Sequence, residues 1–109
     1  MAETRLASDL WVAAYLARVQ AEGIAAYVLH RGDDQAGAVA VKLATCDGQA
    51  VLFTRAYDAT GARIWEAREG AEPEIDQAIQ RQRDFDPDLW VIEVEDRRGR
   101  HLLDQMGLT

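Results

Sequence analysis

Apolar residues recur at helical spacing near the start of the chain. Between positions 9 and 22 they repeat every three or four residues, which predicts a helix whose core face holds Val12, Tyr15, Leu16 and Val19. Ser8 is a suitable N-cap for this helix, and Gly23 is placed to end it. A second stripe lies on the other side of the helix and consists of Leu10, Ala14, Ala17 and Ala21. Either alanine serves here only as a good helix former, or this second face packs against another helix or another copy of the chain.

The pattern then changes to the alternation that is typical of strands. It predicts strands over residues 24–31, 38–45, 50–57, 63–68 and 89–95. Asp47-Gly48 is the best hairpin signal between them. Before the last strand a second helix begins with Pro73 and ends near Asp84, because Pro87 forbids its continuation. We expect its core face to hold Ile75, Ala78, Ile79 and Phe85.

The order of these elements predicts the fold class. Strands joined by short links favour an antiparallel meander of about four to five strands, and we expect both helices to pack on one face of it. The result is a single α+β domain over residues 1–109, a length that suits one domain. Residues 101–106 form either a short helix or a docked tail. Trp11, Trp65 and Trp90 are expected in the core or at its edge.

Composition narrows the possible functions. The chain has 12 basic and 19 acidic residues, and this net charge of −7 argues against nucleic-acid binding. One cysteine, Cys46, excludes an intramolecular disulfide and fits a reducing compartment. The start of the chain does not resemble a signal peptide, and no apolar run is long enough for a membrane span. We therefore expect a cytoplasmic protein.

Three groups of residues resemble a known family. They are Ser8-Asp9-Leu10-Trp11-Val12, then Arg31-Gly32-Asp33 with Ala36-Gly37-Ala38, and then Arg83-Asp84-Phe85-Asp86-Pro87-Asp88-Leu89-Trp90-Val91 with Glu93-Val94-Glu95-Asp96-Arg97. Together they resemble the bacterial family called domain of unknown function 1491, over nearly the whole chain. The segment 85–90 is the most specific part. The resemblance implies a small cytoplasmic bacterial protein, and it transfers no catalytic residue.

Most of the negative charge lies in one segment. Residues 84–96 hold Asp84, Asp86, Asp88, Glu93, Glu95 and Asp96 and no base. The spacing resembles part of a calcium loop, but Leu89 stands where such a loop requires glycine. Two interpretations stay open: the three aspartates bind Mg²⁺ or Mn²⁺ loosely, or they shape a turn while Glu93 and Glu95 face solvent. We expect no resident metal and no cofactor.

A second polar cluster lies at the turn that contains Arg31, Asp33 and Asp34, and a basic strip, Arg97, Arg98 and Arg100, follows the acidic segment. We expect this strip to pair with its acidic neighbours. A nucleophilic set is lacking, since Ser8 is explained as a cap and only a Cys46–His30 pair remains conceivable. The candidate ligand or partner surface therefore consists of Arg31, Asp33, Asp34, Asp84, Asp86, Asp88, Trp90 and Arg97.

These features favour a non-enzymatic interaction module that binds a second copy of itself or another protein. The two-faced first helix, the adjacent acidic and basic segments and the lack of a catalytic set support this interpretation. The alternative is a protein or enzyme that binds a small molecule or a divalent metal. Its site would use the acidic corner at residues 84–88, near the 31–34 loop.

Overall fold

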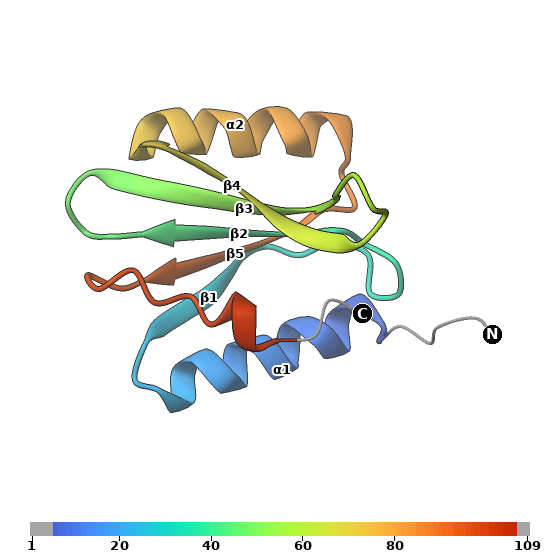
Figure 1. Ribbon diagram of the computed structural model, residues 1–109, viewed down its shortest axis with the longest axis horizontal. Coiled ribbons are helices and arrows are strands. Elements are labelled where there is room, and N and C mark those ends of the chain that lie inside the picture. Colours follow the sequence, from blue (N-terminus) through green and yellow to red (C-terminus); the bar gives the residue numbers. More distant parts are fainter. Residues whose placement is uncertain (1–5, 107–109) are drawn as a thin grey trace.

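A computed structural model describes residues 6–106 of the chain and confirms the α+β class. Two helices and one five-stranded sheet make up the fold (Figure 1). The elements are α1 (Ser8–Ala21), β1 (Ala25–His30), β2 (Val39–Ala44), β3 (Gln49–Tyr57), β4 (Arg63–Ala71), α2 (Glu72–Phe85), β5 (Trp90–Glu95) and the short 3-10 helix η1 (Leu103–Gln105). All seven helices and strands lie where the hydrophobic pattern predicted them.

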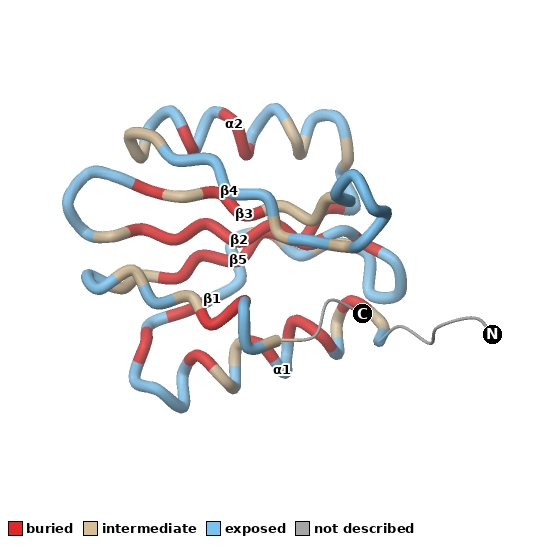
Figure 2. Tube along the Cα trace, viewed as in Figure 1, coloured by how far each residue is buried: buried red, intermediate tan, exposed pale blue. Residues whose placement is uncertain are grey.

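The strand order is β1-β5-β2-β3-β4, which differs from a simple meander. β2, β3 and β4 form the expected antiparallel meander. β5, however, lies between β1 and β2, antiparallel to the first and parallel to the second. The cause is α2, which returns the chain across the sheet, because a parallel pair needs such a long crossover. β2 and β5 thereby become the buried centre of the molecule (Figure 2).

The expectation that both helices share one face of the sheet was wrong. α1 covers one face, where Tyr15 and Val19 join the core around Val41 and Ile92. α2 covers the opposite face, where Ile75 packs in a second core with Val91 (Figure 1). The physical reason is that β2 and β5 carry apolar residues on both faces, Val41 and Ile92 on one and Ala40 and Val91 on the other, so each face must be covered.

The start of α1 also differs from the prediction. Its N-cap is Ala7, and Ser8 is the first helical residue instead. The Ser8 hydroxyl donates a 2.6 Å hydrogen bond to the carbonyl oxygen of Gly37. The backbone N–H groups of Ser8 and Asp9 donate to the carbonyls of Gln35 and Asp34. The loop before β2 therefore caps α1, which a local sequence pattern could not reveal.

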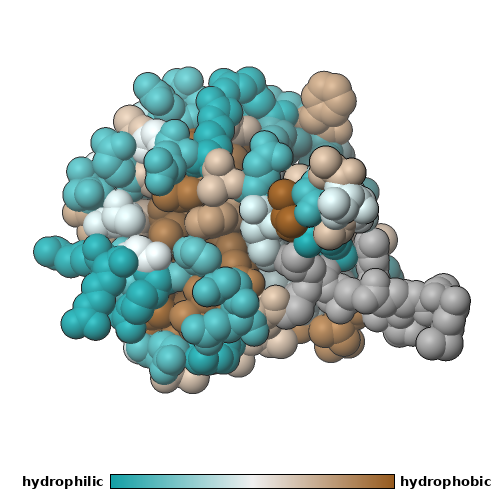
Figure 3. Space-filling view, viewed as in Figure 1, coloured by the Kyte–Doolittle hydropathy of each residue, from teal (hydrophilic) through white to brown (hydrophobic). Residues whose placement is uncertain are grey.

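The face of the molecule in Figure 3 is mainly polar. Hydrophilic side chains surround an apolar band across the middle of the face in Figure 3. The second stripe of α1 faces solvent, and Leu10 is 57% exposed. Among the described residues, no helix has both the length and the apolar character that a membrane crossing needs.

Candidate functional site

Two of the predicted polar segments meet at one end of the sheet. The Asp33 N–H donates a 3.0 Å hydrogen bond to the Asp88 carbonyl, and the Trp90 indole N–H donates one of 2.7 Å to the Asp33 carbonyl. The Arg31 guanidinium lies over the Trp90 ring, 5.1 Å from its centroid. Gly37 permits this approach, since a Cβ there would lie 2.5 Å from the Asp88 oxygen. The 31–34 loop and the 86–90 turn thus form one rigid corner.

The carboxylates of this corner mostly serve its own turns. Asp33 accepts hydrogen bonds from two backbone N–H groups, at 3.2 and 2.9 Å, and Asp86 accepts one of 3.1 Å from the Asp88 N–H. Asp34 pairs with Arg31 at 2.7 Å. Asp33, Asp86 and Asp88 line a hollow of about 200 Å³. Within residues 6–106, no three or more His, Cys, Asp or Glu side chains are grouped so that they could hold a metal ion.

Other candidate residues lie away from this corner. The Asp84 carboxylate accepts a 3.0 Å hydrogen bond from Gln80 on the exposed side of α2. Arg97 follows β5, so it lies at the far end of that strand from Trp90. In the basic strip, Arg100 pairs with Asp96 at 3.0 Å, as expected from the neighbouring charges.

The conceivable Cys46–His30 pair does not form. The register places His30 beside Val91 of β5, which is the end where β2 begins. Cys46 follows the end of β2 and is exposed. β5 also separates β1 from β2, so the two side chains lie at opposite ends of non-neighbouring strands.

Phe85 marks a second feature of the same end of the molecule. The sequence pattern placed it on the core face of α2, which was wrong, because Phe85 is 95% exposed. The buried face of α2 consists of Ile75, Ala78 and Ile79, and Phe85 is the last residue of the helix. A large aromatic side chain is therefore left in solvent, although its burial would contribute about 1.5–3 kcal/mol.

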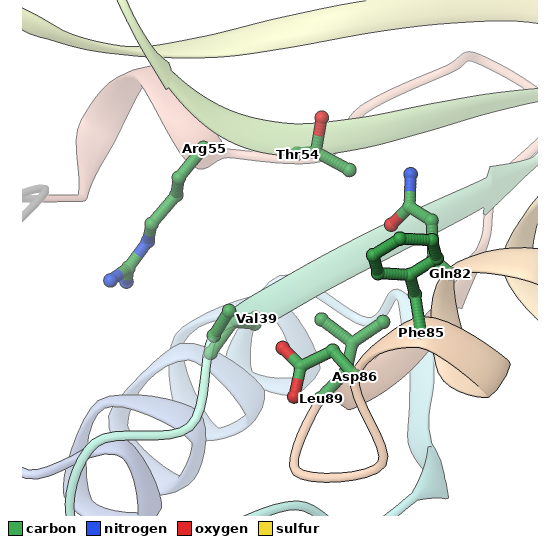
Figure 4. Close-up of a pocket in the computed structure, with 8 residues that line it drawn as sticks. Val39, Thr54, Arg55, Gln82, Phe85, Asp86 and Leu89 are labelled. Atoms are coloured by element: carbon green, nitrogen blue, oxygen red, sulfur yellow. The ribbon is translucent and has the colours of Figure 1, made fainter.

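Phe85 stands at a hollow of about 280 Å³. We call the set of residues that line this hollow the Phe85 patch: Ala38, Val39, Thr54, Arg55, Gln82, Phe85, Asp86 and Leu89. Figure 4 shows Phe85 and Gln82 at the end of α2, with Thr54 and Arg55 on the neighbouring strand β3. The Arg55 side chain points away from Phe85 in this view. The patch thus combines a projecting aromatic ring with a depression that has apolar residues in its wall.

A third hollow, of about 440 Å³, lies beside the start of α1. We call it the arginine hollow, and its polar lining is Ser8, Gln35, Arg55 and Arg63. The guanidinium of Arg55 lies 4.8 Å from the ring centroid of Trp11 and 5.1 Å from that of Trp65. All three hollows share Ala38, which directly precedes β2, so the three hollows lie next to one another.

The sequence did not reveal a buried ionic cluster under α2. Lys42, the sole lysine, is 3% exposed in the middle of β2. Its Nζ lies 2.8 Å from Glu72, 2.7 Å from Asp76 and 3.1 Å from Glu93. Burial alone lowers the pKa of Lys42, but hydrogen bonds to three carboxylates outweigh burial and raise that pKa above its ordinary value. The cluster joins α2 to the sheet, and the only signal for it was a lone cation in an apolar strand.

The cluster continues to the edge strand β1. The Tyr27 hydroxyl lies 2.6 Å from a carboxylate oxygen of Glu93 and 2.7 Å from one of Glu95. These hydrogen bonds to Glu93 and Glu95 raise the pKa of Tyr27 above its ordinary value. Glu93 was expected to face solvent, but it is buried because it lies between Lys42 and Tyr27.

Comparisons with known proteins agree with this fold. The model of the family described as "Protein of unknown function (DUF1491)" matches residues 6–104. A crystal structure of a DUF1491 family protein from Caulobacter crescentus CB15 is 43% identical, with a TM-score of 0.82, over 91% of this chain and 95% of that chain. An NMR structure of a DUF1491 family protein from the same organism gives 42% identity and a TM-score of 0.79, over 93% and 94%.

A solution structure of a protein from A. tumefaciens is 34% identical, with a TM-score of 0.71, over 84% of this chain and 86% of that chain. None of the curated proteins matches the chain. The family match spans both polar segments of the corner and the Phe85 patch. The chain therefore belongs to the DUF1491 family.

Proposed function

We propose that the protein is a non-enzymatic interaction module that forms a homodimer through the Phe85 patch. The observation that carries the proposal is the 95% exposure of Phe85 at the rim of a hollow. Aromatic side chains that fill pockets on a partner supply much of the binding energy of protein interfaces. The hollow, at about 280 Å³, is slightly smaller than the roughly 300 Å³ at which small-molecule pockets begin, so it suits one anchoring side chain.

A projecting ring beside a hollow is complementary to a second copy of itself. In a two-fold dimer each copy offers the same patch, so the Phe85 ring of each copy enters the hollow of the other. Both rings lose their contact with water. At about 1.5–3 kcal/mol for each ring, the pair contributes about 3 kcal/mol or more, which is at least about a hundredfold in the dissociation constant.

The charge of the corner opposes this association moderately. Asp86 belongs to the patch, and Asp84 and Asp88 flank it in the sequence. In a dimer the acidic residues of the two copies come close together, and dissolved salt screens their repulsion. We therefore expect the dimer to become tighter as the salt concentration rises, as is typical of contacts dominated by apolar burial.

The exposed stripe of α1 offers a different interface. Leu10 is its only large side chain, and the other members of the stripe are alanines. The Phe85 patch is the better candidate because it has both a projection and a depression. A matched pair of variants separates the two interfaces: Phe85→Ser removes the ring of the patch, and Leu10→Ser removes the large residue of the stripe.

Sedimentation equilibrium tests the proposal on the whole chain. A reductant is present throughout, because the exposed Cys46 could otherwise link two copies covalently. We expect wild type and Leu10→Ser to dimerise equally, and Phe85→Ser to dimerise at least about a hundredfold more weakly. A wild type that stays monomeric at millimolar concentration, or a Phe85→Ser variant that dimerises as wild type does, would refute the homodimer. The proposal places this dimer in the cytoplasm, where the thiol stays reduced.

A further inference from the structure

We infer that the outer edge of β1 binds an extended segment of a partner protein in which basic and apolar side chains alternate. The strand order places β1 at one edge of the sheet, so β5 is its only neighbouring strand within residues 6–106 (Figure 1). A strand with one unpaired side is a template on which an extended chain can add a further strand. No residue that lines the Phe85 patch belongs to β1, so this site does not depend on the proposed homodimer.

The two edge strands of the sheet differ in their protection against such pairing. β4, at the other edge, carries four charged residues: Arg63, Glu66, Arg68 and Glu69. Charged side chains on an edge strand discourage pairing with another chain. β1 has no acidic residue, lysine or arginine, and its consecutive hydrophobic residues Tyr27, Val28 and Leu29 are 43%, 37% and 36% exposed. β1 is therefore the edge that suits a partner strand.

The backbone of β1 indicates which groups a partner strand would meet. The register with β5 is regular from Ala25 to Val28 and shifts between Val28 and His30, so regular pairing is confined to the first four residues. The Ala26 carbonyl accepts a 2.9 Å hydrogen bond from the side-chain amide of Gln20 in α1, which indicates that it faces the outer side. Backbone groups of alternate residues point to the same side, so those of Val28 face outward as well.

The charges beside the edge favour a basic partner. On the face that carries Tyr27, the directly paired Glu93 forms an ion pair with Lys42 at 3.1 Å. Glu95 forms no ion pair with any basic residue in the part of the chain that the structure describes. Its direct partner in β1 is Ala25, which is exposed and has only a methyl side chain. A residue of an added strand opposite Ala25 would lie about 9.5 Å from Glu95, two strand spacings, which an arginine and a glutamate side chain span together.

The two faces of β1 explain why the partner should alternate. Ala25 and Tyr27 lie on the face that holds Glu95, whereas Val28 lies on the other face. On the first face, one arginine reaches Glu95 and the next lies over the exposed ring of Tyr27, which is a favourable cation–π contact. On the second face, an apolar side chain opposite Val28 removes exposed hydrophobic surface from water. A segment of alternating arginine and valine satisfies both faces.

An NMR titration of the full chain tests the inference with a capped eight-residue peptide of alternating arginine and valine. We expect saturable shifts of the Val28 backbone N–H signal and of the Gln20 side-chain amide signal, because the peptide pairs with Val28 and competes with Gln20 for the Ala26 carbonyl. The backbone N–H signals of β4 are the internal control and should not move. A peptide of alternating glutamate and valine should bind at least tenfold more weakly, because its carboxylates are repelled by Glu95.

Two N-methylated versions of the arginine–valine peptide test the backbone pairing. One carries methyl groups on the valine nitrogens and the other on the arginine nitrogens, so each version blocks one edge of the peptide strand. Only one edge of the peptide faces β1 when the two strands pair. We expect one version to lose binding and the other to bind as the unmodified peptide does. Equal behaviour of the two versions would show that the peptide does not bind as a strand.

Two charge variants complete the test. Glu95→Gln removes the carboxylate beside the edge and should weaken binding about fivefold, the value of one partly exposed ion pair. Glu69→Gln is the matched control, since it removes the same charge from the opposite edge strand, and it should bind as wild type does. The inference is overturned if the arginine–valine peptide causes no saturable shift, if the shifts occur at β4 or the Phe85 patch, or if the two variants behave alike. It is also overturned if the β1 signals move when the chain alone is diluted, since a second copy would then occupy the edge.

Discussion

The buried position of Lys42 leads to a quantitative prediction for the stability of the fold. Lys42→Met keeps most of the side-chain volume and removes the cation. Glu72 and Asp76 lose little, because their side chains are 36% and 54% exposed and exposed ion pairs contribute about 0–1 kcal/mol. The Glu93 side chain is only 10% exposed, so its charge is left in the interior. Removal of one partner of a buried pair costs about 3–5 kcal/mol.

We expect a loss near the lower limit, about 3 kcal/mol, because the Tyr27 hydroxyl still lies 2.6 Å from Glu93. At about 4 °C for each kcal/mol, Tm should fall by about 12 °C. Urea unfolding measured by circular dichroism gives the free energy of unfolding directly. Arg81→Met, an exposed cation on α2, is the matched control and should change that free energy by less than about 0.5 kcal/mol.

A double variant isolates the cause. Lys42→Met with Glu93→Gln removes the buried carboxylate together with the cation, so it should recover at least half of the loss. If Lys42→Met is no more harmful than Arg81→Met, or if the double variant is as unstable as the single one, the reasoning about a buried uncompensated charge is refuted. The pH dependence provides an independent check. Because the pKa of Lys42 is raised in the folded state, its contribution is complete below about pH 10 and is lost above that pH.

Three further predictions follow from the corner and the C-terminal segment. Gly37→Ala should lower the free energy of unfolding, measured with urea, by about 1–3 kcal/mol, because the new Cβ would meet backbone atoms of Asp88 and Asp33. Gly70→Ala is the control and should cost less, because its Cβ would meet a movable side chain. Equal losses in the two variants would contradict the close approach at Gly37. Burial lowers the pKa of His101, which accepts a 3.0 Å hydrogen bond from the Leu103 N–H, so stability should fall as pH drops below about 6.5. His101→Leu should remove that part of the slope, and an unchanged slope would refute its assignment to this residue. Mg²⁺ or Mn²⁺ should leave Tm unchanged in a thermal-shift assay, because the carboxylates of Asp33 and Asp86 accept hydrogen bonds from backbone N–H groups. A shift in Tm that Asp86→Ala abolishes would support a metal site instead.

The positions of the elements followed from the sequence, whereas the arrangement of the strands did not. Helical and two-residue spacing located α1 and the strands, because burial of one face imposes that period. Strand order depends on which surfaces meet in space. The run from Trp90 to Glu95 is buried on both sides, as is typical of a central strand, although Glu93 and Glu95 made one side polar in the sequence. The sequence did not show which strands lie beside β5, because that depends on α2 returning the chain over the sheet.

The candidate site was predictable in part for a similar reason. The two polar segments were recognised from local charge density, and the structure brings them together through backbone contacts that no side-chain pattern records. Phe85 was assigned to the core because helical spacing does not show where the end of a helix is no longer packed against the sheet. Arg55 and Arg63 were missed, since their proximity depends on the register of β3 and β4.

The most direct test of the proposed homodimer is a contact between the Phe85 ring of one copy and the hollow of the other. Isotope-labelled and unlabelled chains are mixed, and a filtered NMR experiment detects only contacts between different copies. We expect cross-peaks from the Phe85 ring of one copy to the methyl groups of Val39 and Leu89 of the other, since these residues line the hollow. A dimer that shows no such cross-peaks, or shows them to Leu10 instead, would contradict the proposed interface.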